Sequence, residues 1–306
     1  MSDAAASPTV SRRTATALLV LVILFWGANW PVMKFGLGYI APLSLVAARV
    51  VLGALTLFVV TAVTGNLHLP RRNDWPIVLG IGLLQMTGFM ALVTIALQVV
   101  PAGRSSILAY TTSLWVVPGA VLLLRERLGR LKLTGFLLGL TGVAVMFNPL
   151  GFDWGDPHVV IGNGLLLLAA VLWAALIVQI RYHRWESSPL ELAPWQLSIA
   201  ALILVPLAAA VDHGDTIRWS RNLDLVLAYN GLVATAFCFW AITTVNRALP
   251  AITTSLGTLG VPLASVIFAA IFLGERITVT NMLGLALIGS GLACVTVADR
   301  HATRSA

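Results

Sequence analysis

The sequence predicts an all-α membrane protein with ten transmembrane helices, built as two inverted repeats of five helices each. Three observations predict this fold class. First, 58% of the 306 residues are hydrophobic and 10% are charged, whereas about 25% are charged in an ordinary soluble domain. Second, ten apolar runs are long enough to cross a hydrocarbon core of about 30 Å. Third, the two halves of the chain resemble one another at a nearly constant offset.

Each of the ten runs begins and ends near a charged residue, a proline or a glycine. The first run follows Arg12 and Arg13 as a signal peptide would, but it is too long and lacks a small-residue cleavage site, so we expect a retained helix. The expected spans are Thr14–Leu37, Pro42–Thr64, Trp75–Val99, Ala102–Leu124, Leu131–Asn148, Val159–Ile180, Leu190–Val211, Leu225–Val245, Ala251–Leu273 and Thr278–Ala298.

The basic residues predict the orientation in the membrane. With the N-terminus placed inside, thirteen Lys and Arg residues fall on the cytoplasmic side and four on the other side. We therefore expect both termini in the cytoplasm and the protein in a bacterial inner membrane. Topology also accounts for the net charge of +7 without any nucleic-acid partner. Cys238 and Cys294 lie in apolar runs without further ligands at metal-binding spacing, so we predict neither a disulfide framework, a metal nor a cofactor.

The internal repeat has an offset of 147 to 149 residues. Matching positions include Trp26 with Trp173, Pro42 with Pro189, Pro101 with Pro250, Glu126 with Glu275, Gly135 with Gly284, and Gly142 with Gly291. Because each copy has an odd number of helices, the second copy must cross the membrane in the opposite direction, a construction that recurs in secondary transporters. The predicted organisation is a tail (1–13), a first repeat (14–148), a linker (149–158), a second repeat (159–298) and a tail (299–306).

Several motifs resemble those of the EamA-type branch of the drug/metabolite transporter superfamily. They are Trp26-Gly27-x-Asn29, Pro42 through Arg49, Pro101-Ala102 and Glu126-Arg127, within a similarity that covers about residues 14–298. The resemblance implies a transporter of five plus five helices around a central cavity, and within the superfamily it is nearest to ten-helix amino-acid exporters. We therefore expect a secondary transporter that exports amino acids, with aromatic ones favoured, or related metabolites by alternating access.

Proline and glycine inside the spans are candidates for hinges. Pro31 lacks an amide hydrogen and opposes the carbonyl of Gly27, so a kink is expected there. Pro118 in the fourth span and Pro262 after Gly260 in the ninth occupy corresponding helices of the two halves. The predicted gating residues are thus Gly27, Pro31, Pro118, Gly260 and Pro262. Packing of small residues between membrane helices is the alternative explanation.

Aromatic and polar side chains away from the run ends are candidates for substrate binding. Flat aromatic faces suit aromatic or cationic substrates, and a polar stripe on the fourth span can hydrogen-bond a zwitterion. The predicted binding residues are Trp26, Asn29, Trp30, Gln85, Tyr110, Ser113, Trp115, Trp173 and Trp240. For each of them, helix packing or an interhelical hydrogen bond is the competing interpretation.

Arg49 is the charged residue that lies clearly inside a predicted span. It follows Pro42 by seven residues, and the spans carry no central Asp or Glu to pair with it. Its partners are expected among backbone carbonyls, Asn29 and a substrate carboxylate, so a structural anchor and a substrate contact both remain open. Its repeat mate is the uncharged Gln196.

The acidic residues and histidines fall in loops, tails and helix ends, and this placement bears on mechanism. Proton relays in membranes use Asp, Glu or His within the spans, so we expect facilitative rather than proton-coupled transport. The sequence also lacks an acid pair, a His-Glu-x-x-His helix and an activated nucleophile at membrane depth, which argues against an enzyme. An exporter of cationic drugs or nucleosides remains an alternative, and a channel, lipid scramblase or membrane enzyme is a remote one. The expected partners are a small-molecule substrate and the lipid bilayer, with the protein a monomer or weak oligomer.

Overall fold

The structure is a computed structural model and describes residues 10–112, 114–116, 129–147, 155–183, 186–248, 258 and 260–304, which form helices and short connections. Six helical runs are long and apolar enough to cross a membrane: Arg12–Gly36, Pro42–Val63, Arg72–Ala96, Pro157–Ile180, Pro189–Val211 and Arg221–Ile242. Three shorter apolar helices are Leu133–Val145, Gly260–Leu273 and Val279–Gly291. Together with Ala102–Ala109, which begins the fourth span, they account for the ten predicted helices.

Apart from the short 3₁₀ helix η1, which has no described counterpart in the second half, the elements follow a similar order in the two halves. The first half consists of α1 (Arg12–Gly36), α2 (Pro42–Val63), η1 (Arg72–Asp74), α3 (Trp75–Gly80), η2 (Ile81–Phe89), α4 (Met90–Ala96), α5 (Ala102–Ala109) and α7 (Arg130–Phe147). The second half consists of α8 (Pro157–Tyr182), α9 (Pro189–Val211), α10 (Arg221–Ala228), η3 (Tyr229–Phe237), α11 (Cys238–Ala248), α13 (Gly260–Leu273) and α14 (Val279–Arg304).

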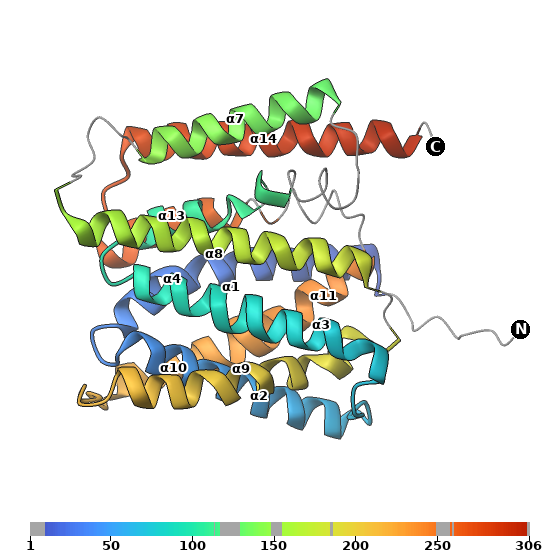
Figure 1. Cartoon of the computed structure of the whole chain (residues 1–306), viewed down its shortest axis with the longest axis vertical. Helices are drawn as coiled ribbons and strands as arrows, with labels where there is room; N and C mark the ends of the chain where they lie inside the picture. Colours follow the sequence, from blue (N-terminus) through green and yellow to red (C-terminus); the bar gives the residue numbers. More distant parts are fainter. Residues whose placement is uncertain are drawn as a thin grey trace, which may run out of the picture.

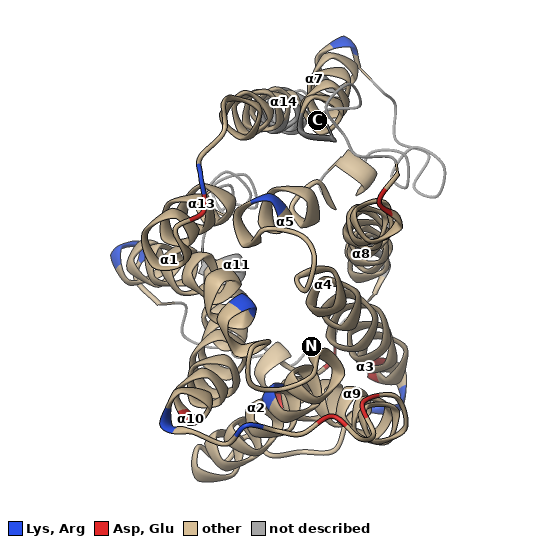
Figure 2. Ribbon diagram, turned by 90° about the vertical axis from the view of Figure 1, so that its left-hand side faces the viewer, with Lys and Arg blue, Asp and Glu red and all other residues tan. Residues whose placement is uncertain are grey.

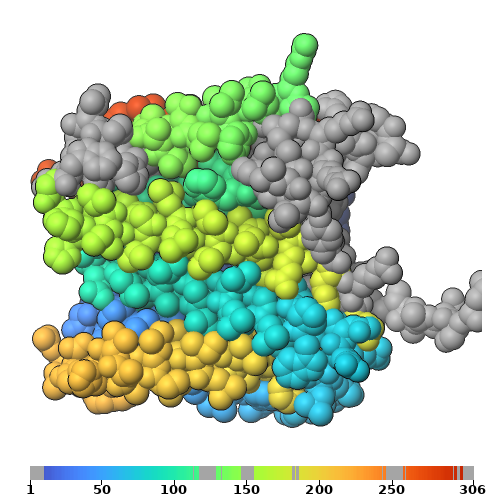
Figure 3. Space-filling model, viewed as in Figure 1, coloured from blue at the N-terminus to red at the C-terminus, as the bar shows by residue number. Residues whose placement is uncertain are grey.

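The helices lie side by side in one bundle, with α7 and α14 paired along one edge (Figure 1). Bands from both halves lie next to each other on the face in Figure 3, where α8 borders the third span. Contacts between the halves are reciprocal: α1 packs on α13 as α8 packs on α5, and α2 packs on η3 as α9 packs on η2. Helices α2 and α7 pack on their own repeat mates, α9 and α14. A pseudo-two-fold axis produces this pattern, which confirms the predicted fold of two inverted five-helix repeats.

Glycines bring these helices into close contact. A Cβ placed on Gly27 of α1 would lie 2.5 Å from the Cβ of Ala264 on α13. On α14, a Cβ on Gly291 would lie 2.5 Å from the carbonyl oxygen of Gly135 on α7. The hydrophobic effect contributes little to the association of helices inside a bilayer, so van der Waals packing must hold them together. Small residues at helix crossings allow the close approach that this packing needs.

The backbone deviates from a regular α-helix at places that the sequence analysis did not predict. Helix α1 continues through Pro31 to Gly36, so the kink predicted there would lie within an unbroken helix. The third and eighth spans instead contain π-helical segments, η2 and η3, each of nine residues. Each π-segment has flanking α-helix on both sides, so the spans remain helical across the membrane.

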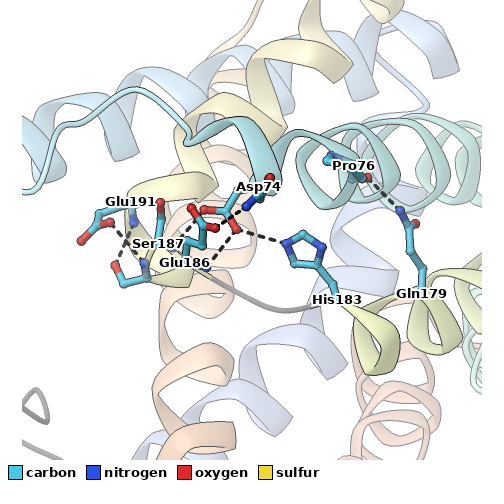
Figure 4. A network of polar contacts seen from close by, with 9 residues as sticks. Asp74, Pro76, Gln179, His183, Glu186, Ser187 and Glu191 are labelled. Carbon is cyan, nitrogen blue, oxygen red and sulfur yellow. Dashed lines mark hydrogen bonds and ion pairs between the residues drawn. The ribbon is translucent and has the colours of Figure 1, made fainter. Parts of the chain in front are cut away.

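Polar contacts fasten the two halves at the ends of the helices. The buried carboxylate of Asp74 accepts hydrogen bonds from the backbone N–H groups of Glu186 (3.1 Å) and Ser187 (2.9 Å) and lies 3.1 Å from Nε2 of His183 (Figure 4). In the same network, Gln179 donates to the carbonyl of Pro76 at 2.7 Å. These contacts join the start of the third span to the connection between α8 and α9.

A second set of polar contacts lies at the ends of the spans opposite to Asp74. The carboxylate of Glu275, after α13, accepts hydrogen bonds from the N–H groups of Ala102 (2.7 Å) and Gly103 (3.0 Å) at the start of α5. Lys34 near the end of α1 donates to the carbonyls of Leu97 and Val100, which follow α4. Lys, Arg, Asp and Glu occupy few positions of the described bundle (Figure 2).

Candidate functional site

The first π-segment, η2, ends with a shift in the helical hydrogen-bond ladder. After η2 the N–H of Met90 bonds to the carbonyls of Gln85 and Thr87 and passes over that of Met86, which an α-helix would use. Such π-bulges occur frequently at functional sites because they re-aim backbone and side-chain groups. The carbonyl of Met86 therefore needs a partner from outside the ladder.

The second π-segment, η3, repeats this geometry 148 residues later. The N–H of Cys238 bonds to the carbonyls of Val233 and Thr235 and passes over that of Ala234. Here the displaced carbonyl has a partner, because the indole Nε1 of Trp26 donates to it at 2.9 Å. The bond joins the first span of one half to the eighth span of the other.

A cavity of about 70 Å³ lies between the halves, and both π-segments contribute to its wall. Its volume is sufficient for several water molecules. It is lined by Trp26, Asn29, Trp30, Met33, Arg49, Gln85, Met86, Phe89, Met90, Val93, Thr94, Tyr110, Trp173, Ala234, Thr235 and Phe239. The wall is thus apolar and aromatic with a few polar groups, as small-molecule sites usually are.

Arg49 gives the cavity a positive charge. Its side chain is 3% exposed, and its Nε and Nη2 donate to Oγ1 of Thr235 at 3.2 and 3.0 Å. Its Nη1 donates to the sulfur of Met33 at 2.9 Å, a weak acceptor. Within the part of the chain that the structure describes, no carboxylate pairs with Arg49. A buried cation without an anion is costly, so this guanidinium is suited to meet an anionic group from outside.

Asn29 supplies a second incompletely bonded polar group. Its residue is 6% exposed, and its Oδ1 has no hydrogen-bond partner among the described residues. Among the described residues, the guanidinium of Arg49 bonds to Thr235 and Met33 and not to Asn29, one of its expected partners. The cavity wall thus contains both an unpaired acceptor and an uncompensated cation.

Aromatic rings form another part of the wall. The ring of Trp173 on α8 lies 5.0 Å from that of Phe89 and 5.6 Å from that of Tyr110, the latter edge to face. These distances are typical of favourable aromatic pairs. Three spans, the third, fourth and sixth, contribute these rings.

The structure brings seven predicted site residues together at the cavity: Trp26, Asn29, Trp30, Arg49, Gln85, Tyr110 and Trp173. Two others lie away from the lining. Trp240 packs on Phe237 at 5.8 Å, and the buried indole nitrogen of Trp115 has no partner among the described residues. Ser113 and Pro118 fall outside the described residues.

The predicted gating residues lie at close helix contacts. Gly27 meets Ala264, and a Cβ on Gly260 would lie 2.9 Å from a side-chain carbon of Ile23. Pro31 lies within the continuous α1, and Pro262 lies in the first described turn of α13.

Sequence reasoning did not identify the other lining residues: Met33, Met86, Phe89, Met90, Val93, Thr94, Ala234, Thr235 and Phe239. Most of them are apolar residues that resemble any other core position of a membrane helix. Thr235 had a usable signal, because it matches Thr87 in the repeat and is one of few polar residues in the eighth span.

A bundle of two inverted repeats with a cavity between them is the construction of many secondary transporters. The comparisons with known proteins agree with this class. The chain belongs to the EamA-like transporter family, whose family model matches residues 13–148 and 160–297, once in each half. It is therefore a membrane transporter and not an enzyme.

Individual relatives cover almost the whole chain. An uncharacterized transporter of Bacillus subtilis, YvbV, is 30% identical over 94% of this chain and 93% of its own length. A protein of Salmonella typhimurium named "Probable amino-acid metabolite efflux pump" is 27% identical over 90% of this chain and 92% of its own. A solved structure titled "Crystal structure of protein" has a TM-score of 0.66 at 23% identity, covering 95% of this chain and 99% of that one, and shows the shared fold.

Proposed function

We propose that this transporter exports amino acids or closely related metabolites, with aromatic side chains preferred, by alternating access across a bacterial inner membrane with both termini in the cytoplasm. The observation that carries the proposal is the uncompensated guanidinium of Arg49 in a cavity walled by aromatic rings. A carboxylate would supply the missing anion, and an aromatic side chain would pack on the rings of Trp173 and Tyr110. The name of the Salmonella relative supports the same substrate class.

The cavity would have to expand to admit an amino acid. Three methionines, Met33, Met86 and Met90, line it, and unbranched thioether side chains change shape at little cost. Access from alternate sides would follow from rocking of the two halves around the cavity, with the fastenings at Asp74 and at Glu275 opening in turn.

We further propose that flux is facilitative. The described cavity lining contains no Asp, Glu or His that could carry a proton. The gradient of the substrate itself would then drive export.

The proposal is tested by counterflow in liposomes that contain the purified protein. Labelled tryptophan and phenylalanine are followed, with leucine, lysine and a cationic dye as competitors, in the presence and absence of a pH gradient. We expect saturable exchange that the aromatic amino acids inhibit best and that a pH gradient leaves unchanged.

Other outcomes would contradict separate parts of the proposal. Flux of the dye or of nucleosides without amino-acid exchange would overturn the substrate class and favour the cationic-drug or nucleoside alternative. Accumulation of an amino acid driven by an imposed pH gradient alone would overturn the facilitative mechanism. Flux that fails to saturate would indicate a channel.

A further inference from the structure

The repeat gives the two π-segments equivalent surroundings, and the hydrogen bonds there are nevertheless different. Trp26 and Trp173 are repeat mates, and so are the displaced carbonyls of Ala234 and Met86. The symmetric counterpart of the bond from Trp26 to Ala234 would be a bond from Trp173 to Met86. All four residues line the cavity.

Only the first of these two bonds is formed in the described part of the chain. The indole of Trp26 donates to the carbonyl of Ala234 at 2.9 Å. This donor and this acceptor are bonded to each other and form a closed pair. The indole of Trp173 makes no hydrogen bond to a described residue, and its ring packs on Phe89 and Tyr110 instead. Trp173 also lines the cavity, whereas Trp115, whose buried indole nitrogen has no partner among the described residues, does not.

We infer that the indole N–H of Trp173 and the carbonyl of Met86 form an open pair that the amino-acid substrate occupies. The N–H donates to a carboxylate oxygen, and the carbonyl accepts from the ammonium group. An α-amino acid carries both groups on one carbon and can satisfy donor and acceptor together, whereas an amine or a simple acid satisfies only one of them. Backbone carbonyls freed from helical bonding at membrane depth coordinate cations in other transporters, and an ammonium group is a cation of the same charge.

This inference rests on the proposed amino-acid substrate, and it assigns unequal roles to two tryptophans that a symmetric site would use alike. The closed pair holds the first span against η3 and stabilises the fold. The open pair contacts the transported molecule. A test must therefore separate binding from stability.

Matched phenylalanine substitutions make this separation, because each removes an indole N–H and keeps an aromatic ring. Trp173→Phe is expected to raise the KM of tryptophan counterflow by about tenfold or more, as loss of a hydrogen bond to a charged group does. It should leave the thermal unfolding temperature near that of the wild type. Trp26→Phe is expected to lower the unfolding temperature, since it breaks a formed bond, and to raise KM less. Trp195→Phe removes the indole bond to the carbonyl of His68 outside the cavity and serves as the control for KM.

A spectroscopic readout keeps the test independent of transport. In protein labelled with ¹⁵N-tryptophan, the indole resonance absent from Trp173→Phe identifies Trp173, and that absent from Trp26→Phe identifies Trp26. Saturating phenylalanine, which has no indole of its own, is expected to shift the Trp173 N–H signal and to move the Trp26 signal less.

Equal KM changes in Trp26→Phe and Trp173→Phe, or a Trp173 signal that saturating substrate leaves in place, would overturn the inference while the proposed function stands. Absence of saturable amino-acid exchange in the wild type would instead overturn the proposed function. In the wild type, N-acetyl-tryptophan is expected to have a higher KM than tryptophan, because the acetyl group removes the ammonium from which the Met86 carbonyl accepts a hydrogen bond. Equal KM values for the two compounds would remove that carbonyl from the site.

Discussion

Arg49 and Gln196 occupy matching positions in the two repeats, on the mated helices α2 and α9, and their surroundings differ. Arg49 lines the cavity and donates twice to Thr235 of the eighth span. Gln196 is 1% exposed and lies beside Gly82 of the third span, and its Oε1 has no partner among the described residues. Thr87, the mate of Thr235, donates to the carbonyl of Gly82 within its own π-segment.

The comparison teaches that the repeats share a scaffold and differ in the chemistry of the cavity wall. The scaffold needs helix lengths, close contacts and π-segments in both copies, and these are present twice. A small asymmetric molecule needs charge and hydrogen-bond donors in one arrangement, which two identical halves cannot supply. Positions where the mates differ are therefore the places to look for substrate recognition.

The largest effect is expected when Arg49 is changed to its mate, in Arg49→Gln. Exchange of amino acids should fall by about 10- to 100-fold, since a hydrogen bond to a charged group contributes about 1.5–3 kcal/mol. The unfolding temperature in detergent should stay unchanged or rise, because the substitution removes a buried charge that no carboxylate of the described residues pairs with. Counterflow and thermal unfolding on the same preparation measure both effects. A clear loss of stability together with unaltered exchange in the folded fraction would show that Arg49 is a structural anchor.

A second substitution gives the first span the residue that the sixth span has at the matching position. Gly27 has Ala174 as its mate, and Gly27→Ala would place a Cβ 2.5 Å from that of Ala264. We expect a destabilisation of about 1–3 kcal/mol, the usual cost of overpacking. Thermal unfolding compares it with Gly164→Ala on α8, where no atom lies within 4 Å of the new Cβ. Equal stability of the two variants would show that α1 and α13 separate easily and that Gly27 is not a packing constraint.

The smallest effect is expected from the threonine mates. Thr235→Val removes the oxygen that accepts two donors of Arg49 and should lower stability by about 1–2 kcal/mol, because buried donors are left unpaired. Saturating substrate should restore part of this loss by supplying another acceptor. Thr87→Val removes a bond within η2 and should change stability less, without a larger response to substrate. The same thermal shift for both variants would contradict unequal roles of the two π-segments.

The sequence was sufficient for the architecture because the signals are long-range and redundant. Apolar runs give the spans, and repeat mates such as Trp26 and Trp173 give the two halves. Span boundaries also agree closely; α2 begins at Pro42 as expected and ends at Val63 against an expected Thr64. A bilayer restricts the chain to few structures, so composition and length carry much of the information.

The site was predictable where residues are unusual for a membrane span, as with Arg49, Asn29 and Trp173. The π-segments were not, because no residue type marks an extra residue per helical turn, and the stretch of η2 reads as ordinary apolar helix. The partners of Arg49 also depend on which helix faces which, and Thr235 is 186 residues away. The kink predicted at Pro31 stays a prediction, since α1 runs through this residue without interruption.

The most direct test of the central claim is competition against tryptophan counterflow by two analogues, tryptamine, which lacks the carboxylate, and indole-3-propionate, which lacks the ammonium. If Arg49 selects a carboxylate, tryptamine should inhibit at least about tenfold more weakly than unlabelled tryptophan, and indole-3-propionate should inhibit more strongly than tryptamine. Inhibition by tryptamine equal to that by tryptophan would contradict the account, because a cavity that binds an amine as well as an amino acid makes no use of its buried guanidinium.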